Sequence, residues 1–241
     1  MIMTEERLAV LRDFEQHLSY RFTDIYILNN ALTHRSFVNE NVGMDYRDNE
    51  RLEFLGDAAL GLCLSDMLML EFPDYAEGQL SKLRSSVVNE LVLAGLARKL
   101  GVGNCLLLGK GEEISGGREK NSLLADTFEA IIAAIYMDGG FDETLLIIRK
   151  LFSPLIAEGA QEIVYRDYKT IVQEFAQNRF HETPRYNLIG EYGPDHDKVF
   201  ETELTLGGEI TTIGMGKSKK EAEQQAAKKA VEMLGPEVSS K

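Results

Sequence analysis

The chain has 241 residues, 44% of them hydrophobic, and its formal net charge at pH 7 is −13. This length and composition predict a soluble globular protein with one sizeable core and a small second domain. No run of eighteen apolar residues occurs, and the N-terminus becomes charged too soon for a signal peptide, which argues against a membrane or secreted protein. We therefore expect a cytoplasmic protein with no membrane partner.

The acidic charge is unevenly distributed. Residues 166–241 contain 11 Lys+Arg and 13 Asp+Glu, a net charge of −2, so residues 1–165 carry −11. Nucleic-acid-binding proteins tend to be basic, and the total charge argues against such a partner at first. The positive residues of the C-terminal third are clustered, however, so net charge alone neither identifies nor excludes a nucleic acid.

Up to residue 157 the apolar spacing is helical, and no strand pattern interrupts it, which predicts an all-α first domain. Thr4 and Asp24 are expected N-caps, whereas Pro73, Gly101 and the Asp-Gly-Gly at 138–140 mark helix ends. The expected helices cover residues 4–18, 24–33, 48–70, 77–99, 118–137 and 141–152.

Other patterns that could indicate a cofactor site are weak. Cys63 and Cys105 lie in apolar segments without C-x-x-C spacing, and the histidines form no zinc pattern with them, so we expect buried free thiols. The Gly-rich segment at 109–120 lacks the pattern of a phosphate-loop NTPase and is expected to be an exposed loop. His34 follows an expected helix end, and we expect a structural hydrogen bond rather than a catalytic role.

The pattern changes class after the segment EGAQEIVYRD at 158–167, which loses the helical period and is the candidate linker. Asp167 is expected to cap a short helix, YKTIVQEFAQN. Three alternating segments follow, PRYNLIGEYG, KVFETELTL and EITTIGMG, with Gly207-Gly208 as a hairpin turn. Ser218 and Glu221 form an expected capping box for a last helix. The predicted order is α-β-β-β-α.

Acidic residues stand at helical spacing in two otherwise apolar segments. NERLEFLGDAAL, at 49–60, places Glu53 and Asp57 at i and i+4, with Glu50 three residues before Glu53. LLADTFEAIIAAIYMDGG, at 123–140, places Asp126 and Glu129 at i and i+3. These spacings put each set of acids on one helix face, at the border of a packed surface.

Acids within one helical turn repel each other unless a cation or a proton intervenes, and LLADTFEAII has no Lys or Arg at a matching spacing. Magnesium prefers hard oxygen ligands, and carboxylates from two facing helices could hold one or two ions with water positions left open. This arrangement suits phosphoryl chemistry, in which metal-activated water attacks phosphorus. Solvated helix faces are the alternative, and spacing alone leaves the two readings about equal.

Four segments of the chain carry a resemblance to a known family. NERLEFLGDAAL resembles the signature of bacterial ribonuclease III, and ALTHRSF, FPDYAEGQLSKLRSSVVNE and LLADTFEAIIAAIYMDGG resemble its other blocks in the same order. The similarity covers nearly the whole chain, because these enzymes end in a double-stranded-RNA-binding domain. It implies an all-α endonuclease domain followed by an α+β domain. The implied division is a catalytic domain at 1–157, a linker at 158–166, an RNA-binding domain at 167–236 and a tail at 237–241.

The resemblance also implies roles for the acids. The metal ligands would be Glu53, Asp126 and Glu129. Asp57 and Glu129 would be the catalytic residues, with Asp57 orienting the ion or the attacking water. Two further acids match the family with less definite roles. Glu50 would lie near the RNA path and the subunit contact, and Glu77 near the catalytic valley. The aromatic residue that matches Phe54 inserts into the partner subunit in this family.

Three lysines crowd the start of the last expected helix, where the macrodipole favours acids instead. These residues are Lys217, Lys219 and Lys220. An anion should compensate them, and a phosphate backbone fits. The segments YKTIVQEF and KKEAEQQAA resemble sequence motifs of a double-stranded-RNA-binding domain. That resemblance implies minor-groove contacts from Thr170, Gln173 and Glu174 on the first helix and from the GPDHD loop with Pro194, Asp195 and His196.

Together these features predict a magnesium-dependent endoribonuclease specific for double-stranded RNA, with manganese left open as a substitute. The resemblance implies a homodimer in which each subunit cuts one strand, leaving 5′-phosphate and 3′-hydroxyl ends with short 3′ overhangs. Precursors of ribosomal RNA and structured messenger RNA are the expected substrates. The alternative is a non-catalytic double-stranded-RNA-binding protein of the same fold, against which both acid pairs argue. A helical partner-binding or ion-buffering protein would leave the C-terminal domain unexplained.

Overall fold

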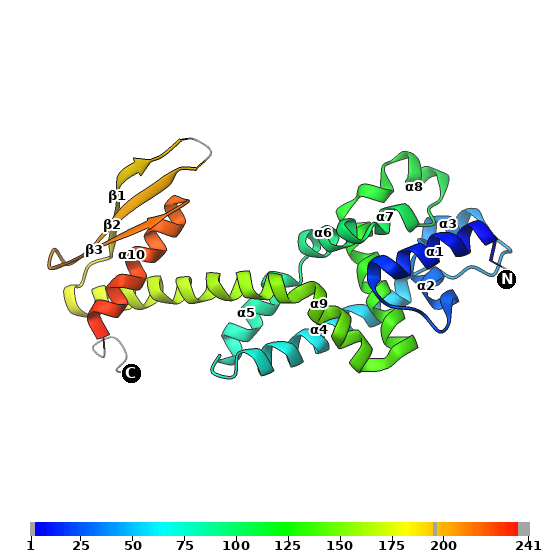
Figure 1. Ribbon diagram of the computed structural model, residues 1–241, viewed down its shortest axis with the longest axis horizontal. Coiled ribbons are helices and arrows are strands. Elements are labelled where there is room, and N and C mark those ends of the chain that lie inside the picture. Colours follow the sequence, from blue (N-terminus) through cyan, green and yellow to red (C-terminus); the bar gives the residue numbers. More distant parts are fainter. Residues whose placement is uncertain (1–2, 195–196, 236–241) are drawn as a thin grey trace. The chain divides into compact units, whose positions relative to one another are not determined.

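The computed structural model describes residues 3–194 and 197–235, with only the backbone described for residues 161–167 (Figure 1). The chain divides into a helical unit, Met1–Gly159, and a second unit, Ala160–Lys241, which combines helices with a sheet. The predicted fold class, all-α followed by α+β, is confirmed. Within the described ranges, no helix combines the length and the apolar character needed to cross a membrane.

Several helices of the first unit begin and end where the local sequence predicts. Helix α1 (Glu5–Leu18) is capped by Thr4, whose hydroxyl accepts a hydrogen bond from the Arg7 N–H at 3.2 Å. Helix α2 (Ile25–Ala31) is capped by Asp24, whose carboxylate accepts from the Tyr26 N–H at 3.0 Å. Helix α4 (Glu50–Glu71) ends before Pro73.

Cys63 and Cys105 are buried free thiols, as expected.

The helix expected over 77–99 is two helices, α5 (Glu77–Val87) and α6 (Glu90–Leu100). The side chain of Asn89 accepts a hydrogen bond from the Val92 N–H at 3.1 Å and starts α6 as its N-cap. Gly101, at φ 75°, ends α6 in the left-handed region, as its position predicts.

Four short elements were not expected: α3 (Arg35–Glu40), α7 (Val102–Cys105), α8 (Lys110–Ile114) and the 3-10 helix Gly117–Glu119. The prediction of a plain loop at 109–120 is therefore wrong, although most of the segment is exposed. The carboxylate of Glu40 accepts hydrogen bonds from the backbone N–H groups of Lys110 and Gly111 at 2.9 and 3.4 Å. Because the residue that caps α8 is so far away in the sequence, no local sequence pattern predicts this helix.

Helix α9 (Asn121–Phe180) replaces three expected helices. Among the described residues of α9, Gly140 is the one with a non-helical backbone, at φ 78° and ψ −171°, and it separates the first two parts as the Asp-Gly-Gly sequence predicts. The prediction of a separate helix after Asp167 is wrong, because the backbone is helical through 158–167 and onward. The residues from 160 to 167 contain no Gly or Pro that would end a helix, even though the apolar period is lost.

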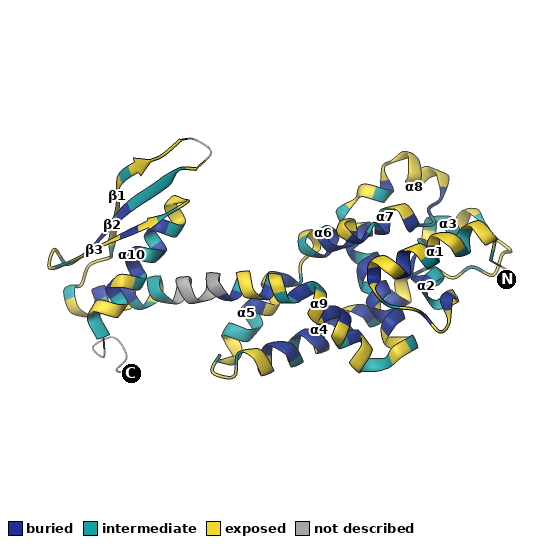
Figure 2. Ribbon diagram, viewed as in Figure 1, coloured by how far each residue is buried: buried dark blue, intermediate teal, exposed yellow. Residues whose placement is uncertain are grey.

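Helices α4 and α9 are in backbone contact. A Cβ atom at Gly56 of α4 would overlap the backbone carbonyl of Glu129 on α9. Buried residues run along both helices (Figure 2), and Leu60, Leu64 and Ile131 are fully buried. The absence of a side chain at Gly56 therefore lets the two helices approach closely. Buried apolar side chains of both helices pack around this contact.

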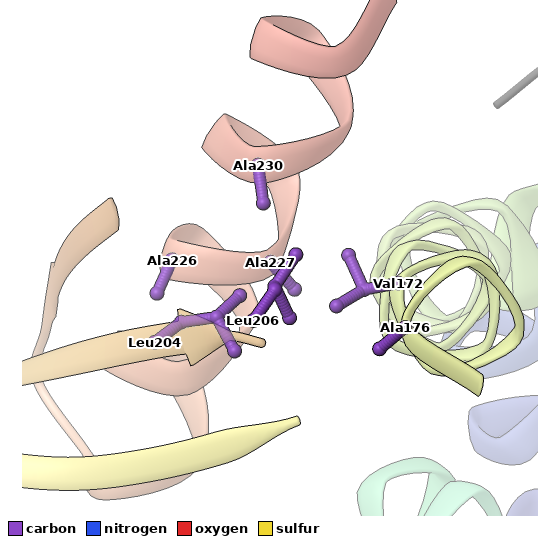
Figure 3. Close-up of a cluster of buried hydrophobic side chains, with 7 residues drawn as sticks. All are labelled: Val172, Ala176, Leu204, Leu206, Ala226, Ala227 and Ala230. Carbon is purple, nitrogen blue, oxygen red and sulfur yellow. The ribbon is translucent and has the colours of Figure 1, made fainter. Parts of the chain in front are cut away.

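The second unit consists of a three-stranded antiparallel sheet with helices on one face. The strands β1 (Arg185–Tyr192), β2 (Val199–Leu206) and β3 (Ile210–Gly216) lie in the order β1-β2-β3. Helix α10 (Lys219–Leu234) follows. The core joins α9, β2 and α10 (Figure 3) through Val172, Ala176, Leu204, Leu206, Ala226, Ala227 and Ala230. The small alanine side chains allow α10 to lie close to the sheet.

The turn and the cap predicted for this unit are confirmed. Gly207 and Gly208 have φ values of 56° and 74° and form the turn between β2 and β3. The Ser218 hydroxyl accepts a hydrogen bond from the Glu221 N–H at 3.1 Å. The Glu221 carboxylate accepts in return from the N–H of Lys217 at 2.7 Å, one residue earlier than in a standard capping box.

The contact at Gly56 leads to a prediction about stability. We expect Gly56→Ala to destabilise the protein by about 1–3 kcal/mol, because the new methyl group would force α4 and α9 apart. Gly61→Ala on the same helix is the matched control, since a Cβ there meets nothing within 4 Å. It should be neutral or stabilise the protein by up to about 1 kcal/mol. Urea denaturation measures both, and equal effects of the two substitutions would contradict the contact.

Candidate active site

Four carboxylates lie where α4 and α9 meet. Glu53 precedes Gly56 by one turn and Asp57 follows it directly, whereas Asp126 precedes Glu129 by one turn. Because Gly56 lies against the backbone of Glu129, the acids of the two helices are brought to the same contact. Asp57 is exposed, and the other three acids are partly buried. The two pairs recognised from spacing therefore belong to one site.

The pKa values show that these acids share one electrostatic environment. Burial, and after it the charges of Asp57, Asp126 and Glu53, together raise the pKa of Glu129 to about 7. Burial also raises the pKa of Glu53, with smaller contributions from Asp126 and Glu50. The carboxylates of each helix thus disfavour the ionisation of the acids on the other helix.

The pKa of Asp126 is raised as well, first by burial and then by the charge of Glu90 in the first turn of α6, while His34 lowers it. Glu90 was not expected in the site. Sequence spacing could not place it there, because α6 approaches α9 only through the tertiary fold.

The donor set fits a divalent cation. Carboxylate oxygens are the ligands that Mg²⁺ and Mn²⁺ prefer, and a cation would offset the burial and the repulsion that raise these pKa values. Within the ranges that the structure describes, no three His, Cys, Asp or Glu side chains converge closely enough to form a ready-made metal site. Holding a cation would therefore require the carboxylates to move closer together than they lie here.

Asn49 is a positioning residue that the sequence did not reveal. It is buried, and its side-chain amide donates to the Ala31 carbonyl at 3.2 Å and to the Thr127 hydroxyl at 3.4 Å. Its backbone N–H donates to the Thr33 carbonyl at 2.9 Å. Asn49 therefore ties the start of α4 to α2 and to α9, next to the turns that carry the acids. The available signal was a polar residue at the start of an apolar helix.

The structural role expected for His34 is confirmed. Its ring Nδ1 accepts a hydrogen bond from the Ser36 backbone N–H at 3.2 Å, which caps α3, and the backbone N–H of His34 donates to the Leu107 carbonyl at 3.0 Å.

The two second-tier acids differ in their placement. Glu50 accepts a hydrogen bond from the Arg35 guanidinium at 2.9 Å, is exposed, and contributes to the raised pKa of Glu53. Glu77 lies in the first turn of α5 and accepts from the Ser81 hydroxyl at 2.7 Å. Glu77 is not among the charges that shift the pKa values of Glu53, Asp126 or Glu129 in the described structure, and its expected place near the catalytic valley stays a prediction.

The lysines at the start of α10 form an exposed cationic cluster consisting of Lys217, Lys219 and Lys220. The ammonium group of Lys217 lies 3.4 Å from the Asp197 carboxylate, and that of Lys219 lies 3.4 Å from Glu191. Exposed pairs of this kind contribute about 0–1 kcal/mol and are readily exchanged for another anion.

The remaining residues expected to contact RNA come from two segments. Thr170, Gln173 and Glu174 are exposed on α9. His196 and Asp195 lie outside the described residues, so their expected contacts stay predictions.

Comparison with known proteins assigns both units. Residues 24–155 match the family described as Ribonuclease-III-like, and residues 168–234 match the Double-stranded RNA binding motif. Ribonuclease 3 of Syntrophobacter fumaroxidans is 50% identical over 228 residues, covering 93% of this chain and 94% of that protein. The chain belongs to the ribonuclease III family. It is therefore an endoribonuclease of the ribonuclease III type, with a nuclease domain and a double-stranded-RNA-binding domain.

Two further relatives agree with this assignment. Ribonuclease 3 of Geobacter metallireducens is 48% identical over 226 residues, covering 93% of this chain and 92% of that protein. A solved nuclease domain of ribonuclease III from Campylobacter jejuni has a TM-score of 0.55 and 43% identity, and covers 60% of this chain and 96% of that one.

Phe54 stands out on the nuclease domain of this ribonuclease III family member. Its side chain is 82% exposed although it lies between Glu53 and the buried core of α4. It borders a groove that Val38, Leu55 and Met137 also line. Charged residues such as Glu50 and Arg51 line the groove as well. An exposed aromatic ring beside a groove of mixed character is typical of a surface that another molecule covers.

The raised pKa of Glu129 predicts a pH-dependent stability without metal. The folded-state pKa of about 7 exceeds the ordinary value of 4.5, so the folded protein binds more protons across that window. The free energy of unfolding should therefore fall as pH rises from about 5 to about 8. Because Glu129 is only partly buried, solvent screening reduces its contribution to on the order of 1 kcal/mol.

Urea denaturation in a chelator at the two pH values measures this effect. Glu129→Gln should remove this part of the decline and make the protein more stable than wild type at the higher pH. Glu158→Gln, an exposed acid on the same helix, is the matched control and should behave as wild type. An unchanged decline in Glu129→Gln would assign the pH dependence to other groups.

Proposed function

We propose that the protein hydrolyses phosphodiester bonds in double-stranded RNA with the help of Mg²⁺ bound by Glu53, Asp126 and Glu129, with Asp57 beside them. The observation that carries the proposal is the contact at Gly56, where the turns of α4 that carry Glu53 and Asp57 adjoin the backbone of Glu129, and the charges of Glu53, Asp57 and Asp126 all act on Glu129. The double-stranded-RNA-binding motif in the same chain supports duplex RNA as the substrate. Mn²⁺ has the same preference for oxygen ligands and is the expected substitute.

In this proposal Glu53, Asp126 and Glu129 hold the cation. A bound divalent cation supplies charge stabilisation to a phosphate oxygen and lowers the pKa of a bound water. Asp57 is exposed, and its carboxylate oxygens can accept a hydrogen bond from the attacking water and so orient it. The carboxylate of Glu129, with a pKa of about 7 before a cation binds, must give up its proton to become a ligand.

The RNA-binding unit supplies the affinity that the acidic nuclease domain lacks. Lys217, Lys219 and Lys220 would contact phosphates, while Thr170, Gln173 and Glu174 would face a minor groove. Because such contacts read the A-form shape and 2′-hydroxyl groups, we expect weak sequence preference. Precursors of ribosomal RNA and structured messenger RNA, encountered in the cytoplasm, are the proposed substrates.

The proposed active form is a homodimer. Phe54 and its groove are the surface we assign to the subunit contact, with Glu50 nearby. The related Campylobacter jejuni nuclease domain is described with a region involved in dimer formation, which supports this assignment. Each subunit would cut one strand, and the offset cuts would leave 5′-phosphate and 3′-hydroxyl ends with short 3′ overhangs.

Incubation of an end-labelled RNA duplex with the purified chain, with and without Mg²⁺, tests the proposed reaction. We expect cleavage only with the cation, and a loss of at least about a thousandfold in Glu129→Gln, because that change removes a proposed ligand. Duplex binding by Glu129→Gln should match wild type in a gel-shift assay, and Glu158→Gln should cleave normally. Binding without any cleavage by the wild-type chain would favour the non-catalytic RNA-binding protein instead.

The lysine cluster predicts a second result. Lys217→Ala and Lys219→Ala should each weaken duplex binding for all sequences and reduce the slope of log K against log salt by about 1. Lys228→Ala, further along α10 and paired with Glu232 at 3.9 Å, is the matched control and should leave both quantities unchanged. Salt titrations of fluorescence anisotropy measure the slopes. Equal slopes in all three variants would place the phosphate contacts elsewhere.

A further inference from the structure

The three-stranded sheet of the second unit has one face that the described helices leave uncovered. Leu204 of β2 points to α10 (Figure 3), and a Cβ atom at Gly214 of β3 would overlap the backbone of α10 at Ala222. Successive residues of a strand point to opposite faces, so the residues between these ones point away from α10. We call this second face the outer face. It includes the odd-numbered positions of 199–205 on β2 and of 211–215 on β3.

Apolar side chains gather on the outer face. Ile213 and Met215 of β3 are 40% and 51% exposed, and they are neighbours on this face because they are two residues apart in one strand. Tyr192 of β1 is exposed too, and its ring lies over Gly190, where a Cβ atom would overlap it. Gly190 pairs with Glu201, which pairs with Met215, so the three positions form one row across the sheet. The ring of Tyr192 therefore belongs to the same face.

Two carboxylates stand between these side chains on β2. Glu203 pairs in register with Ile213, and Glu201 pairs with Met215, which places the paired Cβ atoms about 4.5–5.5 Å apart. The Glu201 carboxylate accepts a hydrogen bond from the Tyr192 hydroxyl at 2.6 Å. Glu203 forms no hydrogen bond or ion pair through its side chain with any residue that the structure describes. The outer face thus combines apolar side chains with two negative charges.

The edges of the sheet are protected against a further strand. On the edge strand β3, the Ile213 carbonyl already accepts a hydrogen bond from the Lys229 ammonium group at 2.7 Å. On the other edge strand, β1, the register is irregular between Leu188 and Gly190. Lysines and bulges at sheet edges both disfavour the addition of another strand. A partner is therefore expected on the outer face rather than at an edge.

The outer face is separate from the lysine cluster. The ammonium group of Lys219 lies 3.4 Å from the Glu191 carboxylate and 5.8 Å from the centre of the Phe200 ring. Glu191 and Phe200 pair in register, and Phe200 has the same parity along β2 as Leu204, so both belong to the face that α10 covers. A protein bound to the outer face would leave the proposed phosphate contacts free.

Charge distinguishes the possible occupants of the outer face. A second copy of this chain would bring Glu201 and Glu203 against the same carboxylates, and like charges across an apolar contact are unfavourable. Arg185, a cation at the far end of the outer face, stands beside Thr205 and already lies 3.8 Å from Glu182. A segment with both apolar and basic side chains would complement the apolar residues and the carboxylates together.

We propose that the outer face binds a basic amphipathic helix of another protein. The apolar stripe of that helix covers Ile213, Met215 and Tyr192, and its Lys or Arg side chains pair with Glu201 and Glu203. Sheet faces in proteins are covered by helices or by other sheets, and a helix is the element that a single segment can supply. The contact is small, so the binding is weak and reversible. It does not depend on cleavage at the acid cluster.

Titration of the full chain with a synthetic peptide tests the proposal. The peptide has about 14 residues, with Leu at i, i+3, i+4 and i+7 and Lys elsewhere. A scrambled peptide of the same composition keeps the charge and loses the apolar stripe. We expect the amphipathic peptide to shift the methyl NMR signals of Ile213 and Met215, and the scrambled peptide to bind at least about tenfold more weakly. Equal affinities, or no shift of these signals up to about 1 mM peptide, would overturn the proposal.

Variants locate the binding. Met215→Gln should weaken the affinity for the amphipathic peptide about tenfold, and Glu203→Gln about threefold. The matched controls are Met233→Gln, an exposed methionine on α10, and Glu209→Gln, an exposed acid between β2 and β3, and both should bind as wild type. Unchanged affinity in the two outer-face variants would overturn the proposal. Shifts of the Met215 signal that grow with the concentration of the chain alone would also overturn it, and would assign the face to a second copy.

Discussion

The approach of α4 and α9 at Gly56 is the constraint on which the site depends. A glycine at this position lets the backbone of one helix touch the backbone of the other at Glu129. The acids are one turn or less from this point of contact, so the distance between the helices also sets the distance between the carboxylates. Asn49 holds the start of α4 in the same arrangement through its bonds to Ala31 and Thr127.

Packing and repulsion oppose each other at this contact. Each fully buried side chain such as Leu60, Leu64 or Ile131 contributes about 1.5–3 kcal/mol. The partly solvated acids repel each other by an amount on the order of 1 kcal/mol, so the packing prevails and the helices remain together. Burial first, and neighbouring negative charge second, raise the pKa values of Glu53, Asp126 and Glu129. The packing of the core therefore keeps these carboxyl groups in positions where their ionisation is unfavourable.

Local chemistry could be predicted from the sequence, and contacts between distant segments could not. The caps at Thr4 and Ser218 were predictable because each uses a side chain within three residues of the N–H that it accepts from. The start of α8 depends on Glu40, seventy residues away. The same division holds in the site, where spacing and family resemblance identified the acids on each helix. The place of Glu90 beside Asp126 required the fold.

The carboxylates paired with the lysines at the start of α10 compete with any phosphate that would bind these lysines. Asp197 and Glu191 already neutralise Lys217 and Lys219 in part. An isolated phosphate therefore gains little by displacing one carboxylate, since it exchanges one weak surface pair for another. A duplex backbone offers regularly spaced phosphates and releases its own counterions when it binds, so it can replace both partners at once. In the proposed RNA complex, these two surface acids would therefore favour long helical RNA over mononucleotides and short oligomers.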